Sequence, residues 1–249
     1  RPKIGDTELI NYGVSLLSGG LDSTTVTTLA GKEIDRLTAV TFAYGQRHSV
    51  ELVRSGQIAE LLGIRHEIID ITFLKEVAWY SALLDPEEFA LPQVDQLDSR
   101  KGSIPNTYVP IRNTIFIALA MAYLESKVLY DIEVAGQVPG DVTSKIFLAP
   151  NVVDYSGYPD CRPEFFISMG NTINLGSKLF NQYGIRTELV TPVIQMSKAQ
   201  IIELGIKVGA PLSITWSCYK GGKVPCHQCD SCVFRAKGFF EAGIIDPAL

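Results

Sequence analysis

Apolar and polar positions alternate along the first 70 residues in a way that predicts strands and helices in turn. Apolar or β-branched runs at residues 13–17, 37–44 and 65–71 are typical of buried parallel strands. Helical spacing between them predicts helices over residues 22–30 and 49–62. This succession of strand, helix, strand, helix and strand favours an α/β fold with a doubly wound, Rossmann-like parallel sheet.

The pattern is less regular beyond residue 71. Residues 72–105 contain several prolines and acidic residues without periodicity, which indicates an insertion or mobile loop. Residues 137–163 form a second stretch interrupted by glycines and prolines, and we predict a second insertion there. We predict a large α/β domain over residues 1–212, with a C-terminal segment, residues 213–249, packed on it. Around the two insertions we expect helices at residues 113–129, 164–180, 197–208 and 233–241, and strands at residues 131–136 and 186–193.

Composition narrows the class of protein. Of the 249 residues, 46% are hydrophobic and 20% are charged, an ordinary globular balance. The net charge of −5 argues against broad contact with the phosphate backbone of a nucleic acid. The most apolar run, residues 115–124, is about half as long as the ~20 residues of a membrane span, so we expect no membrane association. The start of the chain shows no signal sequence, and we expect a cytoplasmic protein.

Four of the five cysteines gather near the C-terminus. Cys218, Cys226, Cys229 and Cys232 lie within fifteen residues, whereas Cys161 stands apart. An odd number of cysteines with C-x-x-C spacing favours a reducing compartment and metal ligation over disulfides. Four thiolates can surround a tetrahedral ion, and a set closed by four protein ligands is structural. The spacing therefore predicts one structural Zn²⁺ rather than four unligated cysteines.

A glycine-rich loop follows the first predicted strand. Its sequence, Ser18-Gly19-Gly20-Leu21-Asp22-Ser23-Thr24, precedes a helix whose first N–H groups and dipole favour an anion. Paired glycines let the backbone approach that anion closely. The loop lacks the lysine of the G-x-x-x-x-G-K-[ST] motif, so it is a different kind of loop. The alternative to an anion site is a tight turn that binds no ligand.

Residues 154–162, with the sequence DYSGYPDCR, combine two tyrosines with carboxylates and an arginine. Tyrosines on a turn-rich segment can stack a flat heterocycle. Asp160 can accept hydrogen bonds from an amino-imino edge such as that of guanine, and Arg162 can pair with a carboxylate. An ordinary tyrosine-rich loop is the alternative, with Cys161 as a small buried side chain.

Taken together, these motifs resemble a known family. The SGGLDS string is similar to the signature of the PP-loop ATP pyrophosphatases. DYSGYPDCR, the YGQRH string at residues 44–48, the Pro110-x-Arg112-Asn113 segment and the late cysteines resemble the 7-cyano-7-deazaguanine synthase (QueC) family over residues 14–238. This resemblance implies an adenine nucleotide alpha hydrolase-like fold. It also implies an enzyme of queuosine biosynthesis that uses Mg²⁺–ATP and ammonia to convert 7-carboxy-7-deazaguanine into 7-cyano-7-deazaguanine.

The resemblance and the position of the motifs assign roles to individual residues. The catalytic candidates are Asp22, Ser23, Arg112 and Lys198, with Asp22 holding Mg²⁺. Lys198 matches a lysine common after the late strand of PP-loop enzymes, although a solvated surface lysine is the alternative. The ATP-binding candidates are Leu17, Ser18, Gly19, Gly20, Leu21, Asp22, Ser23, Thr24, Tyr44, Gln46, Arg47 and His48. The substrate-binding candidates are Asn113, Tyr155, Ser156, Tyr158, Asp160 and Arg162.

Two departures from the family pattern motivate a second hypothesis. Ile111 stands where the family usually has a small residue, and residues 137–153 look like extra chain between the fourth strand and Asp154. An enzyme of this kind that stops at the amide, or transfers the activated deazaguanine to a macromolecule, is the alternative.

The family resemblance also implies a homodimer. A third hypothesis, a nucleic-acid-binding zinc ribbon, rests on the basic residues Lys220, Lys223, Arg235 and Lys237, but the acidic charge disfavours it.

Overall fold

A parallel sheet forms the centre of the molecule. The computed structural model describes residues 9–44, 49–84, 88–89, 104, 106–153, 157–220, 222 and 224–248. Within these residues the sheet has five strands in the order β3-β2-β1-β4-β5, and every neighbouring pair is parallel. The predicted doubly wound α/β class is therefore confirmed. The strands are β1 (Ile10–Leu16), β2 (Arg36–Ala43), β3 (Arg65–Asp70), β4 (Val142–Phe147) and β5 (Thr187–Val190).

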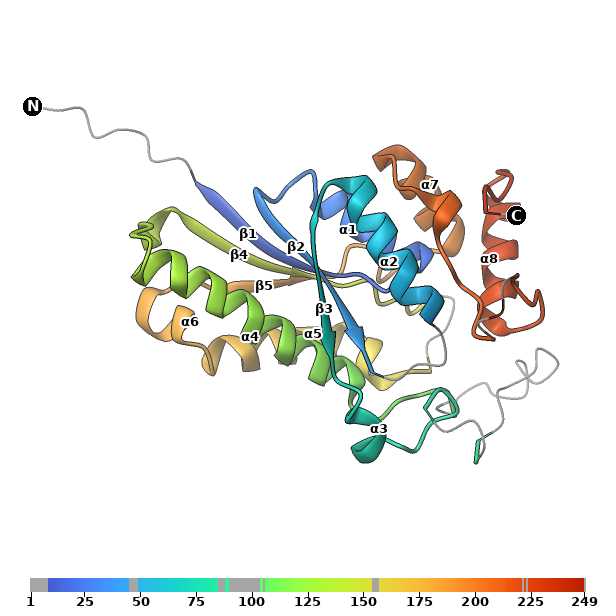
Figure 1. Cartoon of the computed structure of the whole chain (residues 1–249), viewed down its shortest axis with the longest axis horizontal. Coiled ribbons are helices and arrows are strands. Elements are labelled where there is room, and N and C mark those ends of the chain that lie inside the picture. Colours follow the sequence, from blue (N-terminus) through green and yellow to red (C-terminus); the bar gives the residue numbers. More distant parts are fainter. Residues whose placement is uncertain are drawn as a thin grey trace, which may run out of the picture.

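Helices cover both faces of the sheet (Figure 1). On one face lie α1 (Leu21–Ala30), α2 (Ser49–Leu62) and α7 (Lys198–Val208), and α8 (Asp230–Glu241) packs against α7. On the other face lie α4 (Arg112–Glu133), α5 (Pro163–Leu175) and α6 (Lys178–Tyr183). The described residues also form four short helical turns: α3 (Leu74–Val77), η3 (Pro139–Asp141), η4 (Pro159–Cys161) and η5 (Leu212–Ile214).

Strand β1 supplies both cores because successive side chains of a strand point to opposite faces. Tyr12 and Val14 are fully buried in the cluster beneath α4 and α5. Ser15 points the other way, and its hydroxyl lies 2.7 Å from that of Thr27 on α1. A strand buried on both faces holds the chain that follows it rigidly, and here that chain is the Ser18–Thr24 loop.

The predicted fourth strand at residues 131–136 is wrong. Residues 131–133 form the last turn of α4, because apolar residues at helical spacing continue to the buried Ile132. The fourth strand is Val142–Phe147, which pairs with β1 in the middle of the sheet. Residues 137–153 therefore contain a core strand. Only residues 148–153 separate this strand from Asp154, so the apparent extra segment came from misplacing the strand.

Other boundaries agree more closely with the pattern. Helix α2 spans the predicted residues, and α7 begins after Ser197, which forms a capping box with Gln200. The predicted helix at residues 164–180 is instead two helices, because the chain turns at Gly176 and Ser177 caps α6. Strand β5 is shorter than predicted. Most of the predicted 72–105 insertion lies outside the described residues.

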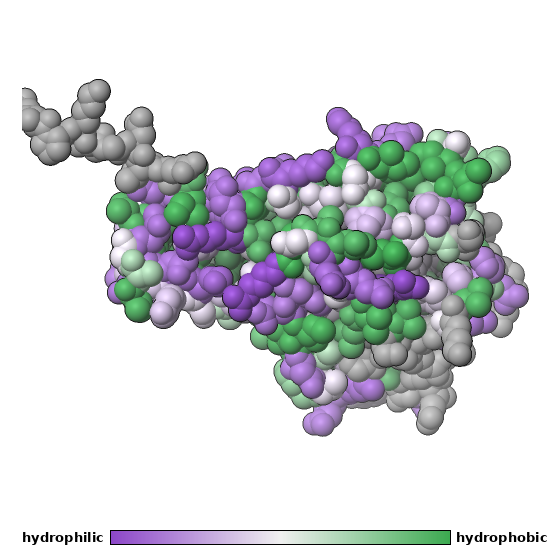
Figure 2. Space-filling model, turned by 45° about the horizontal axis from the view of Figure 1, so that its top comes forward, coloured by the Kyte–Doolittle hydropathy of each residue, from purple (hydrophilic) through white to green (hydrophobic). Residues whose placement is uncertain are grey.

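The surface carries apolar patches separated by polar and charged residues over the face shown in Figure 2. No helix within the described ranges is long and apolar enough to cross a membrane.

Candidate active site and metal centre

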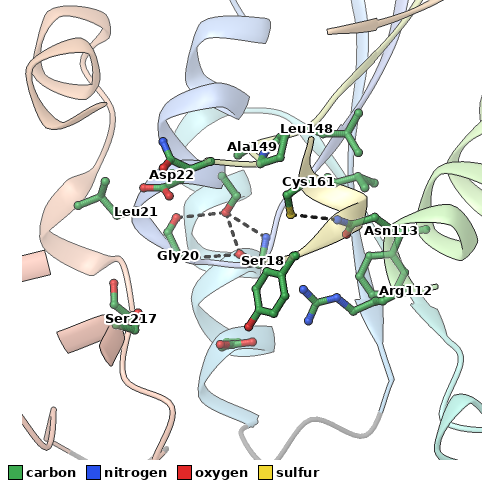
Figure 3. Close-up of a pocket in the computed structure, with 18 of the residues that line it drawn as sticks. Ser18, Gly20, Leu21, Asp22, Arg112, Asn113, Leu148, Ala149, Cys161 and Ser217 are labelled. Atoms are coloured by element: carbon green, nitrogen blue, oxygen red, sulfur yellow. Dashed lines mark hydrogen bonds between the residues drawn. The ribbon is translucent and has the colours of Figure 1, made fainter. Parts of the chain in front are cut away.

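A cavity of about 450 Å³ opens at the carboxyl ends of β1 and β2. Ligands of doubly wound sheets bind at this edge. Figure 3 shows Ser18, Gly20 and Asp22 on one side of the cavity and Arg112 and Asn113 on the other. Further lining residues come from α2 (Glu51), the chain after β4 (Leu148, Ala149, Pro150, Asn151), η4 (Cys161), α7 (Lys198), the C-terminal segment (Trp216, Ser217, Tyr219) and α8 (Asp230, Ser231).

The loop of residues 18–24 has the geometry of an anion site. Gly19 has a φ of +83°, and a Cβ there would lie 2.8 Å from the carbonyl oxygen of Glu51, so the position requires glycine. The Ser18 backbone N–H and hydroxyl both contact the Ser23 hydroxyl, at 3.2 and 2.9 Å. Gly20 caps α1 without a side chain, which leaves first-turn N–H groups of the helix available to an anion.

Asp22 and Lys198 meet beside this loop. The Lys198 ammonium donates to both carboxylate oxygens of Asp22, at 2.8 and 2.6 Å, and both side chains are half-buried. Lys198 is the first residue of α7, and its stem passes against α8. A Cβ at Gly238 would lie 2.3 Å from Lys198 Cγ, so only glycine leaves room for the lysine. The structure thus places Lys198 at the loop rather than on the surface.

Arg112 and Asn113 begin α4 and face the loop across the cavity. The Asn113 backbone N–H donates to the Asp160 carboxylate at 3.1 Å, and its side-chain amide donates to the Asp160 carbonyl at 2.9 Å. The buried Asp160 therefore caps α4 and is not among the residues that line the cavity. Arg162 lies exposed at the start of α5, also outside the cavity.

Ile111, the residue before α4, has a φ of +58°, a left-handed conformation that is unfavourable for a β-branched side chain. Glycine adopts this conformation without strain. The small residue usual in the family thus matches a backbone requirement, and this departure points to no change of product.

The cavity wall around Arg112 carries half-buried ionisable groups. Burial raises the pKa of Glu51 to about 7, although Arg112 opposes the shift. Burial also raises the pKa values of Tyr44 and Tyr158. For Arg112, burial alone would lower the pKa, but Tyr44, Tyr158 and Asp160 raise it, so the guanidinium stays charged.

Burial also raises the pKa of Cys161 to about 11, which keeps it a neutral thiol as the sequence suggested. Sequence reasoning missed Glu51, because a single acidic residue on an amphipathic helix looks like an ordinary surface position.

Besides Asp160 and Arg162, the predicted site residues fall into three groups. Gly19 and Thr24 belong to the loop but do not line the cavity, and Thr24 donates its hydroxyl to the Gly20 carbonyl at 2.8 Å. Gln46, Arg47, His48, Tyr155 and Ser156 lie outside the described residues. The predicted residues that line the cavity are Leu17, Ser18, Gly20, Leu21, Asp22, Ser23, Tyr44, Arg112, Asn113, Tyr158 and Lys198.

The four clustered cysteines form a candidate metal centre. The Sγ atoms of Cys218, Cys226, Cys229 and Cys232 all lie within 4.8 Å of one another. Tetrahedral Zn–S bonds require sulfurs about 3.8 Å apart, so the set fits such an ion. Backbone N–H groups donate to the Cys218 and Cys226 sulfurs at 3.3 to 3.5 Å. Four thiolates this close repel one another unless a cation is shared among them, so the cluster could hold a metal ion.

Two of the basic residues near the cluster are paired with carboxylates of the same protein. The buried Arg235 donates from Nε and Nη2 to the Asp246 carboxylate, at 2.6 and 2.9 Å, and from Nη1 to Thr215 at 2.8 Å. Lys237 pairs with Glu241 on the same helix. Lys223 lies outside the described residues. Because Arg235 is buried, it cannot contact a nucleic acid, and this disfavours the zinc-ribbon hypothesis.

A parallel α/β sheet whose first strand leads through Ser-Gly-Gly-x-Asp-Ser into a helix N-terminus defines a nucleotide-binding enzyme of the PP-loop class. The family model described as "Queuosine biosynthesis protein QueC" matches residues 12–243. The chain belongs to this QueC family.

Relatives from several organisms are named 7-cyano-7-deazaguanine synthase. The 7-cyano-7-deazaguanine synthase of Thermoplasma acidophilum is 44% identical over 234 residues, which cover 94% of this chain and 90% of that protein. The enzyme of that name from Leptospira biflexa is 42% identical, covering 95% and 93%. The Nostoc sp. enzyme is 39% identical, covering 94% and 95%. Among solved structures, NMN synthetase from Francisella tularensis has a TM-score of 0.45 at 18% identity, covering 96% of this chain and 79% of that one.

Proposed function

We propose that this chain converts 7-carboxy-7-deazaguanine and ammonia into 7-cyano-7-deazaguanine at the expense of ATP, through an adenylated acid and an amide. The observation that carries the proposal is one cavity lined by the Ser18–Ser23 loop on one side and Arg112 on the other. Membership of the QueC family and the printed names of the relatives support the choice of substrate. The reaction forms a C–N bond, as in a ligase of queuosine biosynthesis.

Activation of the carboxylate comes first, because its own leaving group would be oxide. A carboxylate oxygen attacks the α-phosphorus of ATP, pyrophosphate leaves, and the acyl-adenylate carries AMP as a good leaving group. Ammonia then displaces AMP to form the amide. A second ATP adenylates the amide oxygen, and loss of AMP and of the N–H protons leaves the nitrile. The protein mainly orients the reactants and stabilises charge.

The residues of the cavity suit these tasks. The first-turn N–H groups of α1 and the hydroxyls of Ser18 and Ser23 would bind pyrophosphate. Lys198 would neutralise charge that develops on the phosphates. Asp22 offers a carboxylate beside the loop, which fits Mg²⁺ that also takes phosphate oxygens and water, and the ion would neutralise phosphate charge. Arg112 would bind the acid, and Asn113, held by Asp160, would line the same wall.

The cysteine cluster and the setting of the enzyme complete the proposal. Zn²⁺ is the ion that four thiolates in a closed tetrahedral set prefer, and it would hold the C-terminal segment together. None of the five cysteines is in a disulfide, which suits a reducing cytoplasm. The homodimer that the family resemblance implies can be tested by light scattering. Metal analysis of the purified protein should give one zinc per chain, and a different metal or none would contradict the zinc assignment.

The test of the reaction is a product analysis. The purified enzyme is incubated with ATP, ammonium and 7-carboxy-7-deazaguanine, and the deazaguanine species and AMP are quantified by mass spectrometry. We expect the nitrile to accumulate with two AMP for each nitrile formed. Accumulation of the amide as the end product, or AMP release that does not depend on the acid, would contradict the proposal.

A further inference from the structure

Glu51 lies beside the loop and inside the cavity. It sits in the first turn of α2, and its backbone carbonyl lies against Gly19, where a Cβ would be only 2.8 Å away. Its side chain lines the cavity. Helix α2 is packed on the sheet through the fully buried Ile58 and Ala59, so the position of Glu51 relative to the loop is fixed by the core.

Three carboxylates line the cavity within the described part of the chain, and they differ in their surroundings. Asp22 is held by both oxygens against the Lys198 ammonium. Asp230 begins α8, on the side of the cysteine cluster. Glu51 lies close enough to Arg112 for the two charges to interact, and its backbone carbonyl lies against Gly19 of the loop. Of the three, Glu51 is therefore the carboxylate that lies near both the loop and the residue proposed to bind the acid.

The amination step needs a proton acceptor at this place. At neutral pH most ammonia is present as ammonium, which has no lone pair and cannot attack an acyl-adenylate. One proton must leave ammonium before the C–N bond forms. As that bond forms, the C–O bond to AMP breaks and AMP leaves with the electron pair. The second N–H proton of the adduct is then released to solvent, and the neutral amide remains.

We propose that Glu51 binds ammonium in the cavity and accepts the proton that converts it into the attacking ammonia. The inference rests on the proposed function. The anionic carboxylate attracts the ammonium cation, and the same group then takes its proton at the place where the acyl-adenylate forms.

The charges around Glu51 suit this role. Arg112 faces it from α4, Tyr44 from the end of β2, and Tyr219 from the segment before Cys226; Tyr158 is part of the same group. Arg47 and His48, which precede α2, lie outside the described residues. Burial raises the pKa of Glu51 to about 7, so that near neutral pH it can both accept and release a proton.

The test separates adenylation from amination in Glu51→Gln. Exchange of labelled pyrophosphate into ATP that depends on the acid reports adenylation without ammonia. We expect exchange by Glu51→Gln to stay within about twofold of the unmodified enzyme. Amide and nitrile formation from ammonium should fall about 10²–10⁴-fold, the usual contribution of a general base.

Hydroxylamine provides the decisive comparison, because it is largely uncharged at neutral pH and needs no deprotonation before attack. Hydroxamate formation by Glu51→Gln should come within about tenfold of the unmodified enzyme. Glu51→Asp should recover part of the ammonium-dependent rate. Glu60→Gln, which changes an exposed carboxylate on the same helix, should behave like the unmodified enzyme in every assay.

Two results would overturn the inference. Parallel loss of exchange, ammonium use and hydroxylamine use would show that Glu51 binds the acid or ATP, and unchanged use of ammonium would show that another group takes the proton. Absence of acid-dependent exchange in the unmodified enzyme would instead overturn the proposed function. If Glu51→Gln fails to fold, the pH profile of the unmodified enzyme decides. At a fixed total concentration of ammonium, amination should then rise with pH through about 7 and level off above it while exchange stays level. A level amination profile, or a rate that keeps rising in proportion to free ammonia, would refute the role.

Discussion

The Ser18–Ser23 loop and the Cys218–Cys232 cluster are both compact sequence motifs, yet they are attached to the molecule in different ways. The loop continues directly from β1, the central strand of the sheet, and leads into α1. The cluster belongs to the C-terminal segment, which the Arg235–Asp246 pair holds together from within and which packs on the rest of the molecule through α8 against α7. The loop therefore takes its position from the sheet, whereas the position of the cluster depends on contacts between helices.

The two regions also touch each other. The Trp216 backbone N–H donates to the Gly19 carbonyl at 2.9 Å, and Trp216 packs with three of the clustered cysteines. The Lys198 stem lies against Gly238 on α8 while its ammonium holds Asp22. These two contacts mean that a change in the C-terminal segment can reach the Ser18–Ser23 loop. The loop is thus the region proposed to perform chemistry, and the C-terminal segment is a region that positions it.

The largest effect is expected from Asp246→Ala, which leaves the buried Arg235 guanidinium without its carboxylate. Loss of one partner of a buried pair costs about 3–5 kcal/mol in the free energy of unfolding. Urea denaturation measures this, with Glu241→Gln on α8 as a control that should change stability by less than about 1 kcal/mol. A loss for Asp246→Ala no larger than that of the control would show that the segment is held by other contacts.

The same pair has a pH dependence of known sign. Burial alone would raise the pKa of Asp246, but Arg235 lowers it below the usual carboxyl range. A group whose pKa is lower in the folded state stabilises the protein above its unfolded pKa, and this stabilisation is lost as the pH falls through the folded pKa. As the pH falls, the difference in the free energy of unfolding between the unmodified protein and Asp246→Ala should therefore shrink. Urea denaturation at a series of pH values measures it.

On the loop side, Asp22→Ala should lower acid-dependent pyrophosphate exchange about 10²–10³-fold, the range for removal of one electrostatic contact to a transition state. Stability should change far less than in Asp246→Ala, because Asp22 is partly exposed and its pair with Lys198 lies at the edge of the cavity. Glu33→Ala, at an exposed position just after α1, is the control. Undiminished exchange by Asp22→Ala would remove the loop from the proposed reaction.

Gly238→Ala tests the link between the two regions. Its Cβ would meet Lys198 at 2.3 Å and push the ammonium away from Asp22, although α8 itself accepts alanine well. We expect exchange to fall about tenfold, equivalent to about 1.4 kcal/mol in the activation barrier. Lys237→Ala, at the neighbouring exposed position, should have no such effect. Equal rates for the two variants would mean that the C-terminal segment does not position Lys198.

The smallest effect concerns the wall opposite the loop. Ile111→Gly should raise the free energy of unfolding by about 1 kcal/mol, because glycine adopts the left-handed conformation without strain. Ile111→Ala keeps a Cβ and should gain less. Product analysis should show the nitrile for all three proteins, and a switch to the amide in any of them would restore Ile111 as a determinant of the product.

The amino-acid sequence by itself determined the fold class, the loop and the cysteine cluster. Each of these depends on residues close together in the chain: apolar periodicity, a Gly-Gly turn before a helix, and ligands within fifteen residues. The position of the fourth strand was not determined in this way. The end of α4 and the following β-branched residues are alike in composition, and pairing with β1 selects residues 142–147.

Only the tertiary structure decided how the cavity is assembled. Glu51, Arg112 and Lys198 come from three helices far apart in the sequence. The family resemblance predicted Arg112 and Lys198, whereas no local pattern distinguishes Glu51 from a surface charge. Packing against the sheet brings them to one edge, where burial raises the pKa of Glu51. The same packing assigns Asp160 to the start of α4 and Arg235 to the interior. Side-chain roles of this kind depend on what surrounds each group, and those surroundings exist only in the folded chain.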